Sequence, residues 1–180
     1  CHHEQDMFAM GGLRKKMPVT FWTFTVGMAA LVGVPGLAGF WSKDLILDAL
    51  HVKHLAGLLV AATVTAGLTS LYMFRAWFLT FFGTYRGHAH PHESPKVMTV
   101  PLVFLALMSA VVGAFYYFVL PVQHTLGHWT TEELHVNPSI AIVATGVAAV
   151  GFLVAWRLYG GPGLERAQGI RTRFAPAYDL

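Results

Sequence analysis

The stretch MPVTFWTFTVGMAALVGVPGLAGFWSKDLILDAL, residues 17–50, decides the fold. Residues 17–41 carry no charged side chain, and a helix needs about 20 apolar residues to cross the hydrocarbon layer of a bilayer. Pro35 removes a helical hydrogen bond, and Gly36 and Gly39 loosen the backbone beside it. As one straight helix the stretch would measure about 50 Å, which exceeds the thickness of a bilayer. It therefore predicts a transmembrane helix that is broken near Pro35 and Gly36.

The composition of the whole chain is that of a membrane protein. Of the 180 residues, 55% are hydrophobic and only 12% are charged, and the mean hydropathy is +0.54. Soluble domains carry about 25% charged residues, so a water-soluble fold and a disordered chain are both excluded. The net charge of +3 is too small to indicate nucleic-acid binding. The single cysteine, Cys1, allows neither an intrachain disulfide nor the thiolate ligands of an iron–sulfur cluster.

Three more apolar stretches follow the first, at residues 55–82, 97–120 and 138–159. Together the four stretches predict an all-α fold, a polytopic membrane bundle of about four transmembrane helices. Small residues recur at helical spacing on the last two, and such faces let transmembrane helices pack closely. They are Ala106, Ala110 and Ala114 on the third stretch and Ala141, Thr145 and Ala149 on the fourth.

The distribution of Lys and Arg predicts how the bundle is oriented. These residues precede the first stretch, separate the second from the third and follow the fourth, whereas residues 121–137 contain none. Because cytoplasmic loops carry the excess of Lys and Arg, we expect residues 1–16 to be a cytoplasmic lead-in to a bundle at 17–160. Residues 161–180 are expected to form a cytoplasmic amphipathic segment. The chain begins at Cys1 rather than at Met, and we expect it to be a piece of a longer protein.

Lys43 and Asp44 are the charged pair just after the predicted break. Both could lie at the far membrane interface, with the lysine stem reaching out to water. Alternatively, Lys43 is a buried, titratable group in a proton or ion path, since transporters use broken helices for such sites. Adjacent residues project from a helix in different directions, so the two charges cannot simply neutralise each other. At least one of them should therefore find a partner on another helix.

Two further polar positions lie within the second stretch. Arg75 is eight residues before Gly83, about 12 Å along a helix, so its side chain could reach the cytoplasmic interface or bind backbone carbonyls. Thr69 is typical of the hydroxyl residues that join transmembrane helices. For both residues the alternative interpretation is a polar lining of the bundle.

The histidine-rich loop HAHPHE, residues 88–93, contains ligand types that zinc accepts. Alternate residues around a proline do not define a tetrahedron, and no metal-binding motif accompanies them, so we interpret the loop as solvated. The chain also lacks the glycine-rich, nucleophile and haem motifs that hold cofactors or cleave bonds. We therefore predict that it holds no metal, no cofactor and no redox centre.

Four strings resemble a known family in their order and spacing. They are HHEQDM at 2–7, MGGLRKKMP at 10–18, VGVPGLAGFWSKDLIL at 32–47 and TSLYMFRAWFLTFFG at 69–83. The chain resembles the late transmembrane part of the L subunits of bacterial NADH–quinone oxidoreductase, respiratory complex I. The large subunits of Mrp-type cation/proton antiporters share this ancestry and remain the alternative. A purely structural membrane segment is a third possibility.

The resemblance implies a fragment of an antiporter-like fold that translocates protons while quinone is reduced elsewhere in the complex. Lys43 matches the lysine of the broken helix and would pass protons outward, and Asp44 matches its acidic neighbour. The resemblance places NADH, FMN, iron–sulfur clusters and quinone in partner subunits. It implies as partners the other membrane subunits of complex I and upstream helices of the same subunit. The location would be the bilayer of the bacterial cytoplasmic (inner) membrane.

Overall fold

The computed structural model describes residues 6–87, 90–118 and 137–160, and these residues form helices and no strand. A short 3₁₀ helix, η1 (Leu13–Lys15), precedes the bundle. The α-helices are α1 (Pro18–Val32), α2 (Ala38–Val52), α3 (Ala56–Phe81), α4 (Lys96–Phe118) and α6 (Pro138–Tyr159). The prediction of an all-α bundle is confirmed. The amphipathic segment 161–180 lies outside the described residues.

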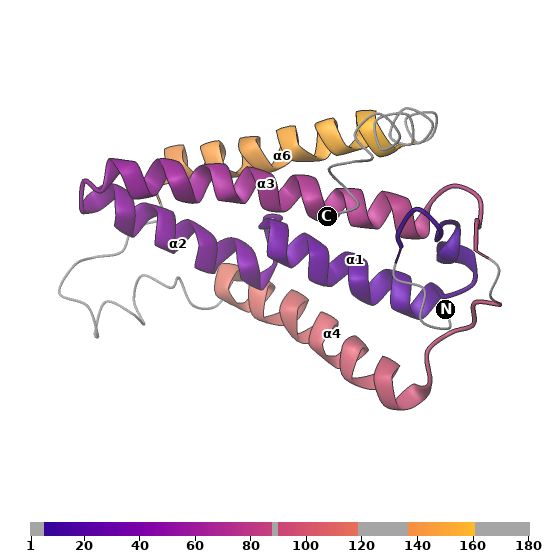
Figure 1. Ribbon diagram of the computed structural model, residues 1–180. Coiled ribbons are helices and arrows are strands. Elements are labelled where there is room, and N and C mark those ends of the chain that lie inside the picture. The colour runs from indigo at the N-terminus through magenta and orange to yellow at the C-terminus, as the bar shows by residue number, and fades with distance from the viewer. Residues whose placement is uncertain (1–5, 88–89, 119–136, 161–180) are drawn as a thin grey trace.

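The first predicted span is two half-helices rather than one helix. α1 and α2 have 15 residues each, so each is about 22 Å long and shorter than the hydrocarbon layer of a bilayer. They run in the same direction, one after the other, along the length of α3 (Figure 1). Residues 33–37 separate them, and both Pro35 and Gly36 lie in this break. The predicted position of the break is confirmed.

The other three predicted spans are single helices, α3, α4 and α6, of 26, 23 and 22 residues. Each is long and apolar enough to cross a membrane. α6 begins as its sequence predicts: the side chain of Asn137 accepts a hydrogen bond from the Ser139 N–H at 3.0 Å, and Pro138 occupies the first turn.

The half-helices α1 and α2 lie between α4 on one side and the pair of α3 and α6 on the other (Figure 1). α3 and α6 form the most extensive helix pair, and Ser70 on α3 donates a hydrogen bond to the Ala148 carbonyl of α6 at 2.6 Å. The predicted packing stripes are wrong at Ala114 on α4 and at Ala149 on α6, which are both exposed. The buried stripe of α6 instead consists of Ala144, Ala148, Gly151 and Ala155.

The segment before α1 and the loop after α3 meet at the same end of the bundle (Figure 1). The Gly12 N–H donates to the Phe82 carbonyl at 3.0 Å. Arg86 donates to the carbonyls of Phe8 at 2.7 Å and Leu79 at 3.1 Å. These bonds fix the N-terminal segment against the end of α3. That this end faces the cytoplasm stays a prediction.

Candidate functional site

The break in the first span begins with a helix ending in which backbone N–H groups bind two of the last four carbonyls of α1. Gly33 has a φ of 89°, a left-handed conformation that favours glycine. The Gly33 N–H donates to the Ala30 carbonyl at 3.1 Å, and the Val34 N–H donates to the Ala29 carbonyl at 2.9 Å. This pair of bonds is the Schellman motif, which closes the C-terminus of α1.

Lys43 completes this helix ending from the other half-helix. Its Nζ donates a hydrogen bond to the Val32 carbonyl, the last of α1, at 2.9 Å. The stem of the side chain lies against Gly33, where an added Cβ would be 3.2 Å from the Lys43 Cδ. The ammonium therefore sits at the negative end of the α1 dipole. The partner of Lys43 is thus a backbone carbonyl on the other half of the same predicted span, not a side chain of another span.

The two half-helices touch through their backbones at Gly39, in the first turn of α2. A Cβ on Gly39 would lie 2.8 Å from the carbonyl carbon of Ala30 and would overlap the carbonyl oxygen. Only glycine therefore permits this approach of α2 to α1. The close approach brings the second turn of α2, which carries Lys43, near the end of α1.

α4 holds the break from the opposite side. Gly36 has a φ of 91°, and an added Cβ on Gly113 of α4 would lie 2.6 Å from the carbonyl carbon of Leu37. The indole N–H of Trp41 donates to the Gly113 carbonyl at 3.1 Å. The break thus contacts α1, α2 and α4, while its residues 34–36 remain exposed.

Asp44 projects into the bundle and is 2% exposed. Its Oδ2 is buried and has no hydrogen-bond partner in the part of the chain that the structure describes. Asp48, one turn further along α2, is 4% exposed. An unpartnered buried carboxylate oxygen is costly, so Asp44 either carries a proton or meets a donor from outside the described residues.

Arg75 and Thr69 of α3 are the two candidates for a polar lining, and both make contacts away from the break. The guanidinium of Arg75 lies 5.9 Å from the ring centre of Phe8 and 5.6 Å from that of Tyr159. The hydroxyl of Thr69 donates to the Thr65 carbonyl of its own helix at 2.8 Å. None of these contacts involves the break, and a lining role for either residue stays a prediction.

Glu93 is a structural residue that the sequence interpretation missed. From the loop before α4 its carboxylate accepts hydrogen bonds from the Val19 N–H at 2.7 Å, the Thr20 hydroxyl at 2.6 Å and the Thr20 N–H at 3.3 Å. Ser94 adds a backbone N–H at 3.2 Å. The prediction of a merely solvated loop is therefore wrong for Glu93. The sequence does contain one signal for such a contact. Met17, which precedes α1, has no side chain able to cap a helix, so the first turn needs a cap from elsewhere in the chain.

The hydrogen bonds of Glu93 also set its acidity. Partial burial acts to raise the pKa of Glu93, but the bonds from the Thr20 hydroxyl and from three backbone N–H groups outweigh this effect. The pKa of Glu93 therefore lies below its usual value, and the carboxylate is charged at neutral pH.

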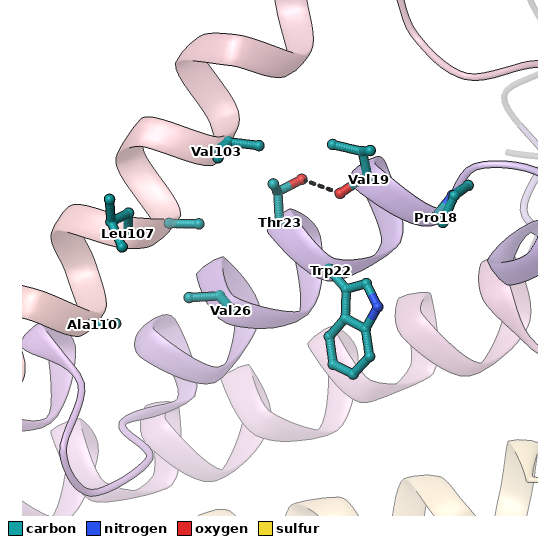
Figure 2. A pocket seen from close by; sticks show the side chains of 9 residues that line it. Pro18, Val19, Trp22, Thr23, Val26, Val103, Leu107 and Ala110 are labelled. Atoms are coloured by element: carbon teal, nitrogen blue, oxygen red, sulfur yellow. Dashed lines mark hydrogen bonds between the residues drawn. The ribbon is translucent and has the colours of Figure 1, made fainter.

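An open apolar groove of about 500 Å³ lies between α1 and α4 (Figure 2). Val26 of α1 and Val103 and Leu107 of α4 are among its lining residues. The Thr23 hydroxyl in the groove is bonded to the Val19 carbonyl of its own helix at 3.0 Å. The groove suits hydrocarbon and supplies no proton carrier.

The described residues contain no group of three His, Cys, Asp or Glu side chains that could hold a metal ion. The predicted absence of metals and cofactors from the whole chain stays a prediction. The chemistry that the described site offers is proton exchange at the Lys43 ammonium and the Asp44 carboxyl.

Known proteins similar to this chain point to one family. Residues 1–69 match the family model described as "NADH:quinone oxidoreductase/Mrp antiporter, TM". NADH-quinone oxidoreductase subunit L of Mycobacterium tuberculosis (strain H37Rv) is 43% identical over 95% of this chain and 29% of the relative. The subunit L of Escherichia coli (strain K12) is 42% identical over 89% of this chain and 26% of the relative.

A chloroplast relative extends the similarity beyond bacteria. NAD(P)H-quinone oxidoreductase subunit 5 of Zygnema circumcarinatum is 37% identical over 98% of this chain and 32% of the relative. The chain thus spans between 26% and 32% of the length of these three relatives.

Proposed function

Because the chain is homologous along nearly its whole length to subunit L of bacterial NADH-quinone oxidoreductases, we propose that it forms part of a proton-translocating membrane subunit of such a complex. In this proposal the quinone is reduced in other subunits, and the released free energy drives protons across the membrane through this one. NADH, FMN, iron–sulfur clusters and quinone bind to the partner subunits. The chain works in the bacterial cytoplasmic membrane, together with upstream helices of the same subunit.

The observation that carries the proposal is the bond from Lys43 Nζ to the Val32 carbonyl across the helix break. A charged group within a bilayer costs several kcal/mol and is retained where it has a function. A carbonyl partner and a helix dipole hold the ammonium in place, and no carboxylate among the described residues forms a salt bridge with it. Lysine, unlike arginine, can lose its proton when it is taken out of water.

Asp44 supports the same role from the next position on α2. Its buried Oδ2 has no partner among the described residues, so it can take a proton or stabilise a charge that arrives on a neighbouring group. We propose that Lys43 carries the proton toward the far side and that Asp44 assists its release.

Lys43→Arg and Lys43→Met test the carrier role in the full-length subunit within the assembled complex. Proton uptake driven by NADH would be measured in membrane vesicles, and assembly would be checked on native gels. A carrier role predicts at least a tenfold loss of rate in both variants, equivalent to about 1.4 kcal/mol in the barrier. A role confined to closing the end of α1 predicts that arginine, which also donates to a carbonyl, restores most of what methionine loses. Lys53→Met, at the exposed end of α2, is the matched control and should pump normally.

An Mrp-type cation/proton antiporter is the second candidate, because the matching family model covers both groups. An antiporter would exchange cations for protons in vesicles without NADH. Deleting the gene would then abolish this exchange and leave proton pumping by NADH oxidation intact.

A further inference from the structure

We propose that Glu93 is a positioning residue for Lys43, and that it acts through α1, whose first turn it binds while Lys43 binds its last carbonyl. The inference rests on the proposed role of Lys43 in proton transfer. It adds a residue from the loop between α3 and α4 to that mechanism.

The backbone donors of the first turn of α1 depend on Glu93. Pro18 has no N–H, and the Phe21 N–H is bonded to the Met17 carbonyl at 2.9 Å. The two remaining donors, those of Val19 and Thr20, both bind the Glu93 carboxylate. Glu93 thus replaces the local cap that α1 lacks, from a position 73 residues away from Thr20 in the chain.

At the opposite end of α1 the bonds of Gly33 and Val34 close the helix, and Lys43 adds a bond to the last carbonyl. The Lys43 ammonium binds the Val32 carbonyl at 2.9 Å. A negative side chain therefore lies at the positive end of the helix dipole, and a positive side chain lies at the negative end. The helix between them is a continuous rod of 15 residues, about 22 Å long.

α4 connects the two ends of this arrangement. Glu93 lies three residues before the first residue of α4, and Gly113 near the other end of α4 binds Trp41 and packs on the break. α1 and α4 run in the same direction, with the apolar groove between them (Figures 1 and 2). α1 and α4 also pack directly on each other, and the groove begins at Pro18 and Val19 in the first turn of α1. The bonds of Glu93 therefore fix α1 at the end of the pair where the groove begins. Loss of the Glu93 end would let α1 shift along α4 and move the Val32 carbonyl away from Lys43.

Amide hydrogen exchange in the purified complex tests the inference without reference to pumping. Glu93→Ala should raise exchange in the first turn of α1, residues 18–22, and also at the break, residues 33–37. We expect the exchange rate to increase about fivefold, because the loss of a helix cap usually costs a free energy that corresponds to this factor. An increase confined to residues 18–22 would show a local cap only and would overturn the inference. His90→Ala, an exposed residue of the same loop, is the matched control and should leave both segments unchanged.

Proton uptake per assembled complex gives the functional readout. Glu93→Ala should lower the rate of uptake about fivefold, whereas Glu93→Gln, which keeps one acceptor oxygen, should lose less. A merely structural role would lower the amount of complex and leave the rate per complex unchanged, and this result would also overturn the inference. Full pumping by Lys43→Met would instead refute the proposed function, so the two failures are distinguishable.

Discussion

The indole N–H of Trp41 lies 3.1 Å from the carbonyl oxygen of Gly113 and donates a hydrogen bond to it. The bond joins α2, which carries Lys43, to α4, which carries no charged residue near the break. In a bilayer an indole N–H has no water to bind, so a protein carbonyl is the partner that stabilises it. The position of Lys43 therefore depends on α4 as well as on α1.

Gly113→Ala should destabilise the protein although alanine is the better helix former. An added Cβ would lie 2.6 Å from the carbonyl carbon of Leu37, so the break or α4 must move. Overpacking of this kind costs about 1–3 kcal/mol. Gly146→Ala on α6, where a Cβ meets nothing within 4 Å, is the control and should be neutral or stabilising by up to about 1 kcal/mol. The temperature at which each variant complex is inactivated in detergent measures its stability. Equal inactivation temperatures for the two variants would contradict the prediction.

Ser70→Ala should weaken the pair of α3 and α6. The variant loses the hydrogen bond from Ser70 to the Ala148 carbonyl, and bonds of this kind in membrane proteins are worth about 0.6 kcal/mol on average. Thr65→Val is the matched control, because the Thr65 hydroxyl binds only within its own helix, to the Ala61 carbonyl at 2.8 Å. Unfolding of the subunit in mixed micelles should show a smaller midpoint shift for Thr65→Val than for Ser70→Ala.

The sequence predicts the features of this protein that depend on local pattern. Apolar length places α3, α4 and α6, and Pro35 with Gly36 places the break, because these signals act within one segment. Features that depend on tertiary contact were missed or misplaced. The buried face of α6 cannot be chosen from small residues alone, since alanines occur on several of its faces. The Val32 carbonyl as partner of Lys43, and Glu93 as the cap of α1, require knowledge of which segments meet.

Acid should loosen the start of α1. The pKa of Glu93 is lower in the folded protein than its ordinary value of about 4.5, so the charged cap stabilises the fold above that pH. This stabilisation is lost as the pH falls from 4.5 through the lower, folded-state pKa. Amide exchange of residues 18–22, corrected for the intrinsic effect of pH, should increase over this range in the parent protein. Glu93→Gln has no carboxyl to protonate, so the same increase in that variant would contradict the assignment.

The orientation of the bundle determines whether Lys43 lies in the outer half of the membrane. α1 begins at the end that the N-terminal segment shares with the loop after α3, and α2 continues away from that end (Figure 1). The Lys and Arg distribution predicts that the shared end faces the cytoplasm, and with that orientation Lys43 lies beyond the break on the outer side. The orientation of this one end therefore decides the direction of the proposed proton transfer.

Single cysteines at two loop positions test this orientation in a background without Cys1. In intact cells whose outer membrane has been made permeable, an impermeant maleimide should label Thr131→Cys, in the stretch that has no Lys or Arg. It should label His90→Cys, in the exposed loop before α4, only after lysis. Labelling after lysis controls for the reactivity of each cysteine, and native gels control for assembly. The reverse pattern would place Lys43 in the inner half of the membrane and would remove the basis for its role in outward release.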